Sequence, residues 1–349
     1  MISSTSLPAI QSESVCPPLS LSLASLGFSF VNDMEDSDFY IAFNHSANLY
    51  RDFIESGGAK ANTVLLRSEP SSVYPAQYQE KIERLYGNIF TLGATTDLES
   101  KLIAWPYYYN PNPLTPNDWS ASLRGEMEEL INRQDHKLDN WKTRTLQLTM
   151  VASNKVSSSA TNNYRLRRRF AAQLPPSMFH VFGNLWDSKI LNKISHRLRV
   201  LGFALRTGVV PSLSQLYGNL FRKYPTFCGG IANKHDVIRD SKFSLVIENN
   251  DGYVSEKLID ALVGGSIPIY FGGDFRAFGV PERSVVTGLY SVNEIVAFIE
   301  CVSDQEVEER LSETRRWLES PDFLQTWFGD NVFDSLASDI GNQFRKLVK

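Results

Sequence analysis

The sequence predicts an α/β protein built from two domains, each around a parallel sheet. The strongest indication is residues 243–273, where two apolar runs enclose a helical segment in the order strand, helix, strand. The first run, FSLVI, shows little polar alternation, which is typical of a strand covered on both faces. Strands also alternate with helices before residue 144, and a new strand begins at residue 145. A chain of 349 residues has room for two Rossmann-like domains.

The N-terminal end is rich in Ser and Pro, so we expect residues 1–18 to be disordered. The residues that follow alternate leucine with serine or alanine, a pattern that also favours the start of a strand at Leu19, Leu21 and Leu23. We place the N-terminal domain over residues 19–144.

The N-terminal domain has strand candidates at residues 38–43, 63–66 and 87–92. Between the first two, residues 46–56 read as a helix that ends at a Gly-Gly pair. The aromatic segment WPYYYNPNP, from Trp105, could stack on a sugar or pack in the core, and both interpretations stay open. A charged helix is expected at residues 124–140.

The second domain is placed over residues 145–330. Its first strand, TLQLTMVA, is followed by a basic helix from residue 162 and by a strand at residues 179–182. Helices are expected at residues 292–303 and 304–318, and residues 331–349 form a C-terminal helical segment. Residues 186–226 show no clear periodicity, and we assign them no structure.

Polar residues follow the strand at residues 243–247, at the edge of the sheet where open α/β folds bind ligands. Ser255 can cap the next helix, whose N-terminus would favour a diphosphate. Lys257 adds a positive charge, and Glu256 can accept hydrogen bonds from sugar hydroxyls. These features favour a nucleotide-sugar site. The alternative is that both charged residues belong to the solvated face of an amphipathic helix.

Composition limits the partners. The net charge of −4 gives no global basic field, so nucleic acid is not an expected partner. The three cysteines lie far apart, in neither a metal-ligand spacing nor a disulfide framework, and the five histidines are scattered. Without a long apolar run we expect a soluble, cytoplasmic protein, which leaves room for peripheral membrane association.

Two further features of the sequence suit phosphate binding and general-base catalysis. The only dense basic cluster consists of Arg165, Arg167, Arg168 and Arg169, which suits phosphate binding but also fits a solvated helix face. Glu69 follows a strand directly before Pro70, which keeps the chain extended and directs the carboxylate toward a cleft between the domains. A general base needs such a carboxylate near an acceptor hydroxyl, although an ordinary loop acid fits Glu69 better when it is taken alone.

Other motifs point elsewhere. Asp36-Ser37-Asp38 matches the D-x-D pattern of metal-dependent glycosyltransferases, but it precedes a strand, so we read it as a turn. The glycine-rich patterns of nucleotide hydrolases and dinucleotide oxidoreductases are missing from the sequence.

Residues 243–273 resemble the donor-site signature of the α-1,3/1,4-fucosyltransferase family (glycosyltransferase family 10). Glu248-Asn249 stands at the strand end, and Tyr253-Val254-Ser255-Glu256-Lys257 leads into the helix. Three further matches fall in family order: LLRSEPSSVYP with Glu69, MVASNK, and RRRFAAQL.

This resemblance implies a GT-B fold, in which two Rossmann-like domains face each other across a cleft. The N-terminal domain would bind the acceptor and the C-terminal domain GDP-fucose, with inversion at the anomeric carbon. Glu69 matches the general base, and Arg167 best matches the diphosphate arginine, with Arg165 or Arg168 still open. The remaining donor-binding matches are Asn154, Glu248, Asn249, Tyr253, Glu256 and Lys257. No metal and no further cofactor is implied.

The expected function is therefore the transfer of fucose from GDP-fucose to a hydroxyl of an oligosaccharide or glycolipid, in an α-1,3-type linkage on a surface polysaccharide or lipopolysaccharide. The loop between Asn249 and Tyr253 is short, which departs from the family pattern. A GT-B transferase with another nucleotide-sugar donor and a non-catalytic carbohydrate-binding protein are the alternatives. The sequence does not indicate an oligomeric state.

Overall fold

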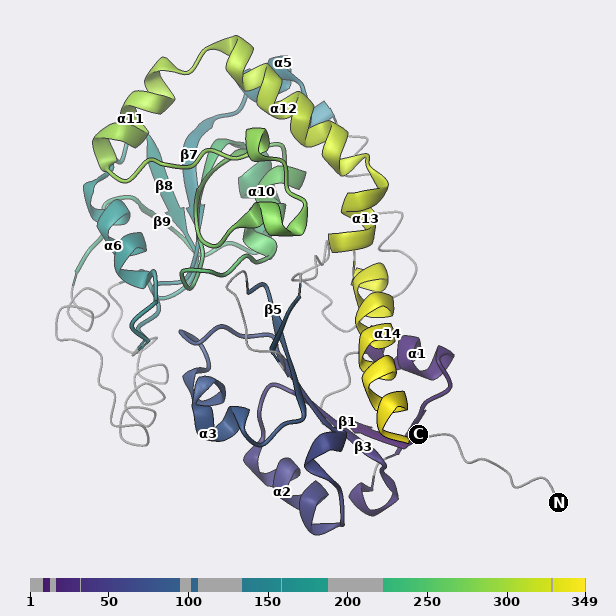
Figure 1. The fold of residues 1–349 in the computed structure, drawn as a ribbon. Helices are drawn as coiled ribbons and strands as arrows, with labels where there is room; N and C mark the ends of the chain where they lie inside the picture. Colours follow the sequence, from purple (N-terminus) through teal and green to yellow (C-terminus); the bar gives the residue numbers. More distant parts are fainter. Residues whose placement is uncertain are drawn as a thin grey trace.

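A computed structural model describes residues 9–12, 17–31, 33–94, 102–105, 134–157, 159–187, 222–327 and 329–348. These residues form two α/β units, each built around a parallel sheet (Figure 1). The predicted α/β class is confirmed. We propose the boundary between the units at residues 144/145, immediately before the first strand of the second sheet.

The first unit contains a six-stranded parallel sheet in the order β2-β1-β3-β4-β5-β6. Its strands are β1 (Ala9–Ser12), β2 (Ser29–Phe30), β3 (Phe39–Phe43), β4 (Thr63–Arg67), β5 (Asn88–Leu92) and β6 (Leu102–Trp105). Its helices are α1 (Pro17–Ser25), α2 (Ala47–Glu55) and α3 (Glu80–Glu83). The three strands expected in this domain correspond to β3, β4 and β5.

Residues 9–12 form a strand, whereas we expected disorder up to residue 18. Strand β1 pairs with both β2 and β3, and its Ile10 is fully buried, so core packing outweighs the polar composition around it. The leucines after it form helix α1 and not a strand. Leu19 and Leu23, four residues apart, share the buried face, while Leu21 is 72% exposed. Leucine at every second position over five residues is therefore too short a pattern to distinguish a strand from a helix.

The second unit contains a five-stranded parallel sheet in the order β11-β10-β7-β8-β9. Its strands are β7 (Leu146–Val151), β8 (Phe179–Phe182), β9 (Phe227–Gly229), β10 (Ser241–Ile247) and β11 (Ile267–Phe271). Its helices are α6 (Tyr164–Gln173), α9 (Lys234–Arg239), α10 (Glu256–Val263), α11 (Val292–Cys301), α12 (Asp304–Leu318) and α13 (Pro321–Trp327). Helix α5 (Leu138–Lys142) precedes the proposed boundary, but its Trp141 packs in the core of the second unit.

The predicted strand-helix-strand unit at residues 243–273 is confirmed as β10, α10 and β11. Both faces of β10 are covered, because Val246 packs with α10 while Leu245 and Ile247 pack in the core cluster that contains residues of α6 and α11. Pro268 lies on the edge strand β11, where its missing backbone donor costs no ladder bond.

The longest helix of the described residues, α14 (Gly329–Val348), returns from the second unit to the first (Figure 1). Its buried Phe344 stacks on Phe39 of β3, with ring centroids 4.0 Å apart. Four other residues of α14 are buried in the same core, namely Phe333, Leu336, Ala337 and Ile340. The last segment of the chain therefore completes the core of the first unit.

Several expectations fall partly or wholly outside the described residues. Of the charged helix at residues 124–140, the structure describes only the end, a 3-10 turn at Gln134–His136 and the start of α5. The aromatic segment after Trp105 and most of residues 186–226 are likewise not described. None of the helices in the described ranges is both long and apolar enough to cross a membrane.

Candidate functional site

Two adjoining cavities lie at the carboxyl end of the second sheet. The cleft cavity, of about 230 Å³, is lined by Glu69 and Pro70 of the first unit and by residues of the second. The inner cavity, of about 350 Å³, extends between β7, β10, α9 and α10. Ser153, Glu256 and Lys257 line both, so they stand where the two cavities meet. The predicted site residues that line the cleft cavity are Glu69, Arg167, Asn249, Tyr253, Glu256 and Lys257.

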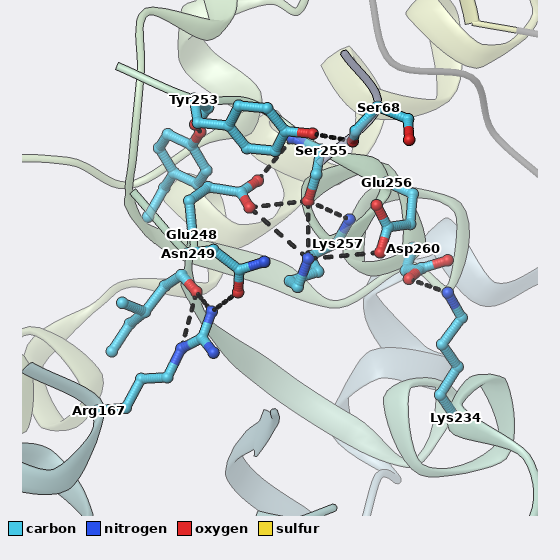
Figure 2. Close-up of polar contacts among 12 residues, drawn as sticks. Ser68, Arg167, Lys234, Glu248, Asn249, Tyr253, Ser255, Glu256, Lys257 and Asp260 are labelled. Carbon is cyan, nitrogen blue, oxygen red and sulfur yellow. Dashed lines mark hydrogen bonds and ion pairs between the residues drawn. The ribbon is translucent and has the colours of Figure 1, made fainter. Parts of the chain in front are cut away.

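Helix α10 begins at Ser255, whose hydroxyl accepts a hydrogen bond from the backbone N–H of Lys257 as an N-cap. The same hydroxyl donates to Oε2 of Glu248 at 2.7 Å, and the backbone N–H of Ser255 donates to Oε1 at 2.7 Å (Figure 2). The carboxylate of Glu248 is thus bonded through both oxygens and is fully buried. Glu248 holds the start of α10 in place and does not line either cavity.

Lys257 and Glu256 form a charged pair at the N-terminus of α10. The ammonium of Lys257 lies 3.3 Å from Oε1 of Glu256 and 3.8 Å from Oε2 of Glu248. Burial alone would raise the pKa of Glu256, but Lys257 and Lys234 together lower it to about 2. Glu256 therefore stays ionised and can accept hydrogen bonds at any neutral pH.

Arg167 is the member of the arginine cluster that lines the cleft cavity. Its guanidinium donates to the carbonyl oxygen of Ile247 from Nε at 3.1 Å and Nη2 at 2.5 Å, and to Oδ1 of Asn249 at 2.8 Å (Figure 2). Arg165 and Arg169, in contrast, are exposed. The end of β10 thus fixes Arg167 beside the loop that leads to α10.

Asn154 lies in the loop after β7. It is almost fully buried, its backbone N–H donates to the carbonyl of Asn184, and its Oδ1 accepts a hydrogen bond from Arg168. It lines neither cavity and supports the loop after β7. The neighbour Lys155 lines the cleft cavity instead, although our sequence-based site did not include it. The sequence places a lysine after this strand but gives no sign of which of residues 153–155 faces the cleft.

The backbone of Glu69 is fixed by two hydrogen bonds to its carbonyl oxygen. Gln77 Nε2 and the hydroxyl of Tyr78 donate to its carbonyl oxygen at 2.9 and 3.0 Å. None of the residues that the structure describes donates a hydrogen bond to its carboxylate, which is half-buried and faces the cleft cavity. Burial raises the pKa of Glu69, while the positive charges of Lys155 and Lys257 act against that rise.

The loop before α10 is fastened to the first unit. The hydroxyl of Tyr253 donates to the carbonyl of Ser68 at 2.9 Å (Figure 2), and the backbone N–H of Val254 donates to the carbonyl of Gly93 at 2.7 Å. A Cβ at Gly93 would lie 2.2 Å from the carbonyl oxygen of Val254, so glycine is required there. Asn250 adds a third connection, because its Oδ1 accepts from the backbone N–H of Ser72 at 3.1 Å. Tyr253 therefore binds the residue next to Glu69.

The inner cavity contains a second charged pair. Lys234 of α9 donates to Oδ2 of Asp260 on α10 at 2.5 Å (Figure 2). Within the described parts of the chain, no group of three or more His, Cys, Asp or Glu residues is arranged to hold a metal ion.

Comparison with known proteins gives a partial match in sequence and a match in fold. No protein-family model matches the chain. A segment of 87 residues is 39% identical to an α-(1,4)-fucosyltransferase of Arabidopsis thaliana, and the match covers 24% of this chain and 21% of that protein. The chain therefore matches only about a fifth of this curated relative's length.

Solved structures extend the likeness over the whole chain. An α1,3-fucosyltransferase in complex with GDP is 15% identical, with a TM-score of 0.51 over 99% of this chain and 92% of that chain. The Anabaena protein HepE, in complex with UDP and glucose, is 9% identical, with a TM-score of 0.51 over 96% of this chain and all of that one. The predicted GT-B fold and the resemblance to fucosyltransferases are confirmed.

Proposed function

We propose that this chain, fucosyltransferase-like in sequence and GT-B in fold, is an inverting glycosyltransferase that moves fucose from GDP-fucose to a hydroxyl of an oligosaccharide. One observation carries the proposal. The cleft cavity joins a carboxylate of the first unit, Glu69, to two fixed cations of the second, Arg167 and Lys257. A base on one side and phosphate-binding groups on the other are what a glycosyl transfer between two substrates requires.

In this mechanism Glu69 takes the proton of the acceptor hydroxyl while that oxygen attacks the anomeric carbon of fucose. The bond from this carbon to the diphosphate breaks on the opposite face, so the configuration inverts. The absence of a bonded donor at the Glu69 carboxylate, among the described residues, suits a base that must accept a proton.

Negative charge grows on the departing GDP and is met by the N-terminus of α10, by Lys257 and by Arg167. A fixed donor of this kind contributes about 2.7 to 4 kcal/mol in comparable oxyanion sites. These groups supply the positive charge in the proposed reaction, which therefore requires no bound metal. The glucose- and UDP-bound HepE shares the fold, so a GT-B transferase with another donor is the second candidate.

Glu256 stands where the two cavities meet, and we assign it to the ribose hydroxyls, with the nucleobase in the inner cavity. Glu248 and Asn154 act by holding the donor-side loops and not by contact with the donor. The acceptor we favour is a surface polysaccharide or lipopolysaccharide that receives an α-1,3-type linkage.

Transfer assays with purified protein, GDP-fucose and a panel of oligosaccharide acceptors test the proposal. Glu69→Gln removes the base, so we expect transfer to fall at least about 100-fold, the lower range for general base catalysis. GDP-fucose binding, measured by calorimetry, should be retained. The matched control Glu35→Gln changes an exposed acid of the first unit and should leave transfer unaltered.

Absence of both transfer and GDP-fucose binding would contradict the proposal. Turnover of another nucleotide-sugar in a donor panel would favour the second candidate. A non-catalytic carbohydrate-binding protein would bind acceptor without donor turnover, and Glu69→Gln would then change nothing measurable.

A further inference from the structure

Asp260 is a buried carboxylate at the wall of the inner cavity, and one of its two oxygens has no hydrogen-bond partner among the described residues. Its side chain is 3% exposed, and it lines the inner cavity together with Lys234. Oδ2 accepts the hydrogen bond of Lys234, whereas Oδ1 has no hydrogen-bond partner among the described residues. A buried acceptor without a partner is costly and needs an explanation. A ligand N–H in the inner cavity would supply the missing donor.

The position of Asp260 indicates which part of a ligand would reach it. Asp260 follows Glu256 by four residues on α10, so it lies on the same side of the helix about 6 Å further along the axis. In the proposed function the diphosphate lies at the start of α10 and the ribose at Glu256. The next group of the donor is the nucleobase, which would lie at Asp260.

The walls of the inner cavity suit a flat ring. Val151, Leu245, Ile238 and Ala261 are among the residues that line it with apolar groups, and Lys234 and Asp260 are among its polar residues. Its volume of about 350 Å³ lies within the usual range for small-molecule sites. An apolar cavity with a few fixed polar groups is typical of specific nucleobase binding.

We propose that Asp260, oriented by Lys234, selects guanine as the base of the donor by accepting a hydrogen bond from its N1–H and 2-amino edge. This inference rests on the proposed function and names the residue that reads the donor nucleotide. A carboxylate only accepts hydrogen bonds and an ammonium only donates them. Guanine offers two adjacent donors to Asp260 and its O6 acceptor to Lys234. Adenine and cytosine place a ring nitrogen acceptor against the carboxylate, and uracil offers a single N–H.

The charge state of Asp260 agrees with this role. Burial raises its pKa to about 6, while Lys234 acts in the opposite direction. At neutral pH the carboxylate is therefore mainly ionised and available as an acceptor.

Calorimetric titration of the wild-type protein with GDP and with inosine diphosphate, which lacks the 2-amino group, tests the inference without any variant. We expect GDP to bind about 10-fold more tightly or better, the difference made by a hydrogen bond to a charged group. ADP should bind more weakly than both. Equal affinity for GDP and inosine diphosphate, or tighter binding of ADP or UDP than of GDP, would overturn it.

Asp260→Asn gives a sharper result. In this variant the amide oxygen can take the place of Oδ2 and keep the hydrogen bond from Lys234. The amide N–H₂ group, a donor, then takes the place of the unpartnered acceptor Oδ1. We expect GDP binding to weaken about 10-fold or more, while xanthosine diphosphate, which has a carbonyl at position 2, binds more tightly than it does to the wild type. Asp274→Asn, an exposed change that lines neither cavity, is the control and should alter no affinity.

An equal loss of affinity for every nucleotide in Asp260→Asn would show that Asp260 is merely structural and would refute the inference. The transfer assay judges the proposed function separately. A protein that prefers GDP over inosine diphosphate but transfers no fucose would refute the proposed function and leave the role of Asp260 intact.

Discussion

Glu69 and Lys155 line the cleft cavity from different units, and each affects the pKa of the other. Burial raises the pKa of Glu69, and Lys155 is the first of the charges that oppose this rise. Burial lowers the pKa of Lys155, and Glu69 opposes that shift. The strength of the proposed base therefore depends on a residue of the second unit.

The pH dependence of transfer should report this pair. The base must be ionised, so kcat/KM should fall as the pH drops through the pKa of Glu69, which lies above its ordinary value of 4.5. Lys155→Met removes a charge that lowers this pKa, so the acid limb of the pH–rate profile should move to higher pH. Lys60→Met, an exposed change in the first unit, is the control. An acid limb that does not move in Lys155→Met would contradict the coupling.

At the scale of single residues, the sequence showed which residues belong to the candidate site but not what their side chains contact. The resemblance places Arg167 in a motif, but only burial separates it from its exposed neighbours Arg165 and Arg169. The motif also marks Glu248, yet its carboxylate folds back onto Ser255. Which way a side chain turns at a strand end depends on packing between segments far apart in the chain, and no local pattern records it.

The start of helix α10 depends on one hydroxyl. Ser255 accepts from the backbone N–H and from Nζ of Lys257 and donates to Glu248. It thereby joins the end of β10, the first turn of α10 and the cation of the proposed donor site.

Ser255→Ala should be more destabilising than the loss of an ordinary cap. Removal of an N-cap hydroxyl costs about 1 kcal/mol, and here the buried Glu248 also loses a charge-assisted hydrogen bond. We expect a loss of about 2 to 4 kcal/mol in the free energy of unfolding, measured in urea. Ser303 caps α12, and among the described residues its hydroxyl accepts a hydrogen bond only from the backbone N–H of Glu306, so Ser303→Ala should cost about 1 kcal/mol. Equal losses in the two variants would disprove the added role of Ser255.

At the scale of elements, prediction succeeds where several local signals agree. Residues 243–273 combine two buried strands, a serine cap and a Gly-Gly end, and the structure has each of them. Helix α1 was predicted wrongly because the run LSLSL fits the spacing of both a strand and a helix. Its structure is decided by the core it meets, which includes residues from the other end of the chain.

At the scale of the whole molecule, α14 connects the second unit to the core of the first (Figure 1). This helix buries its apolar side chains against α1 and β3 of the first unit, more than 280 positions earlier in the sequence. A C-terminal helical segment is expected from the sequence, but its packing partner is not, because helical periodicity shows that a face is apolar and not what covers it.

Phe344→Ala should therefore destabilise the first unit. Phe344 is fully buried and stacks on Phe39, and truncation of a buried Phe costs about 3 to 5 kcal/mol. Leu347→Ala, at a position that is 46% exposed in the same helix, should change stability by about 0.5 kcal/mol or less. Chemical denaturation of both variants checks this expectation. Similar losses in the two would mean that α14 does not complete the core.

Hydrogen bonds of Tyr253, Val254 and Asn250 with the first unit hold the two sides of the cleft together. All three hydrogen bonds link the loop before α10 to segments beside Glu69 or at the end of β5. Any hinge movement that widens the cleft must break them, at a cost of about 0.5 to 1.5 kcal/mol for each bond. These contacts therefore limit how far the cleft can open, so in the proposed reaction the width of the cleft would restrict the acceptor before any side chain recognises it.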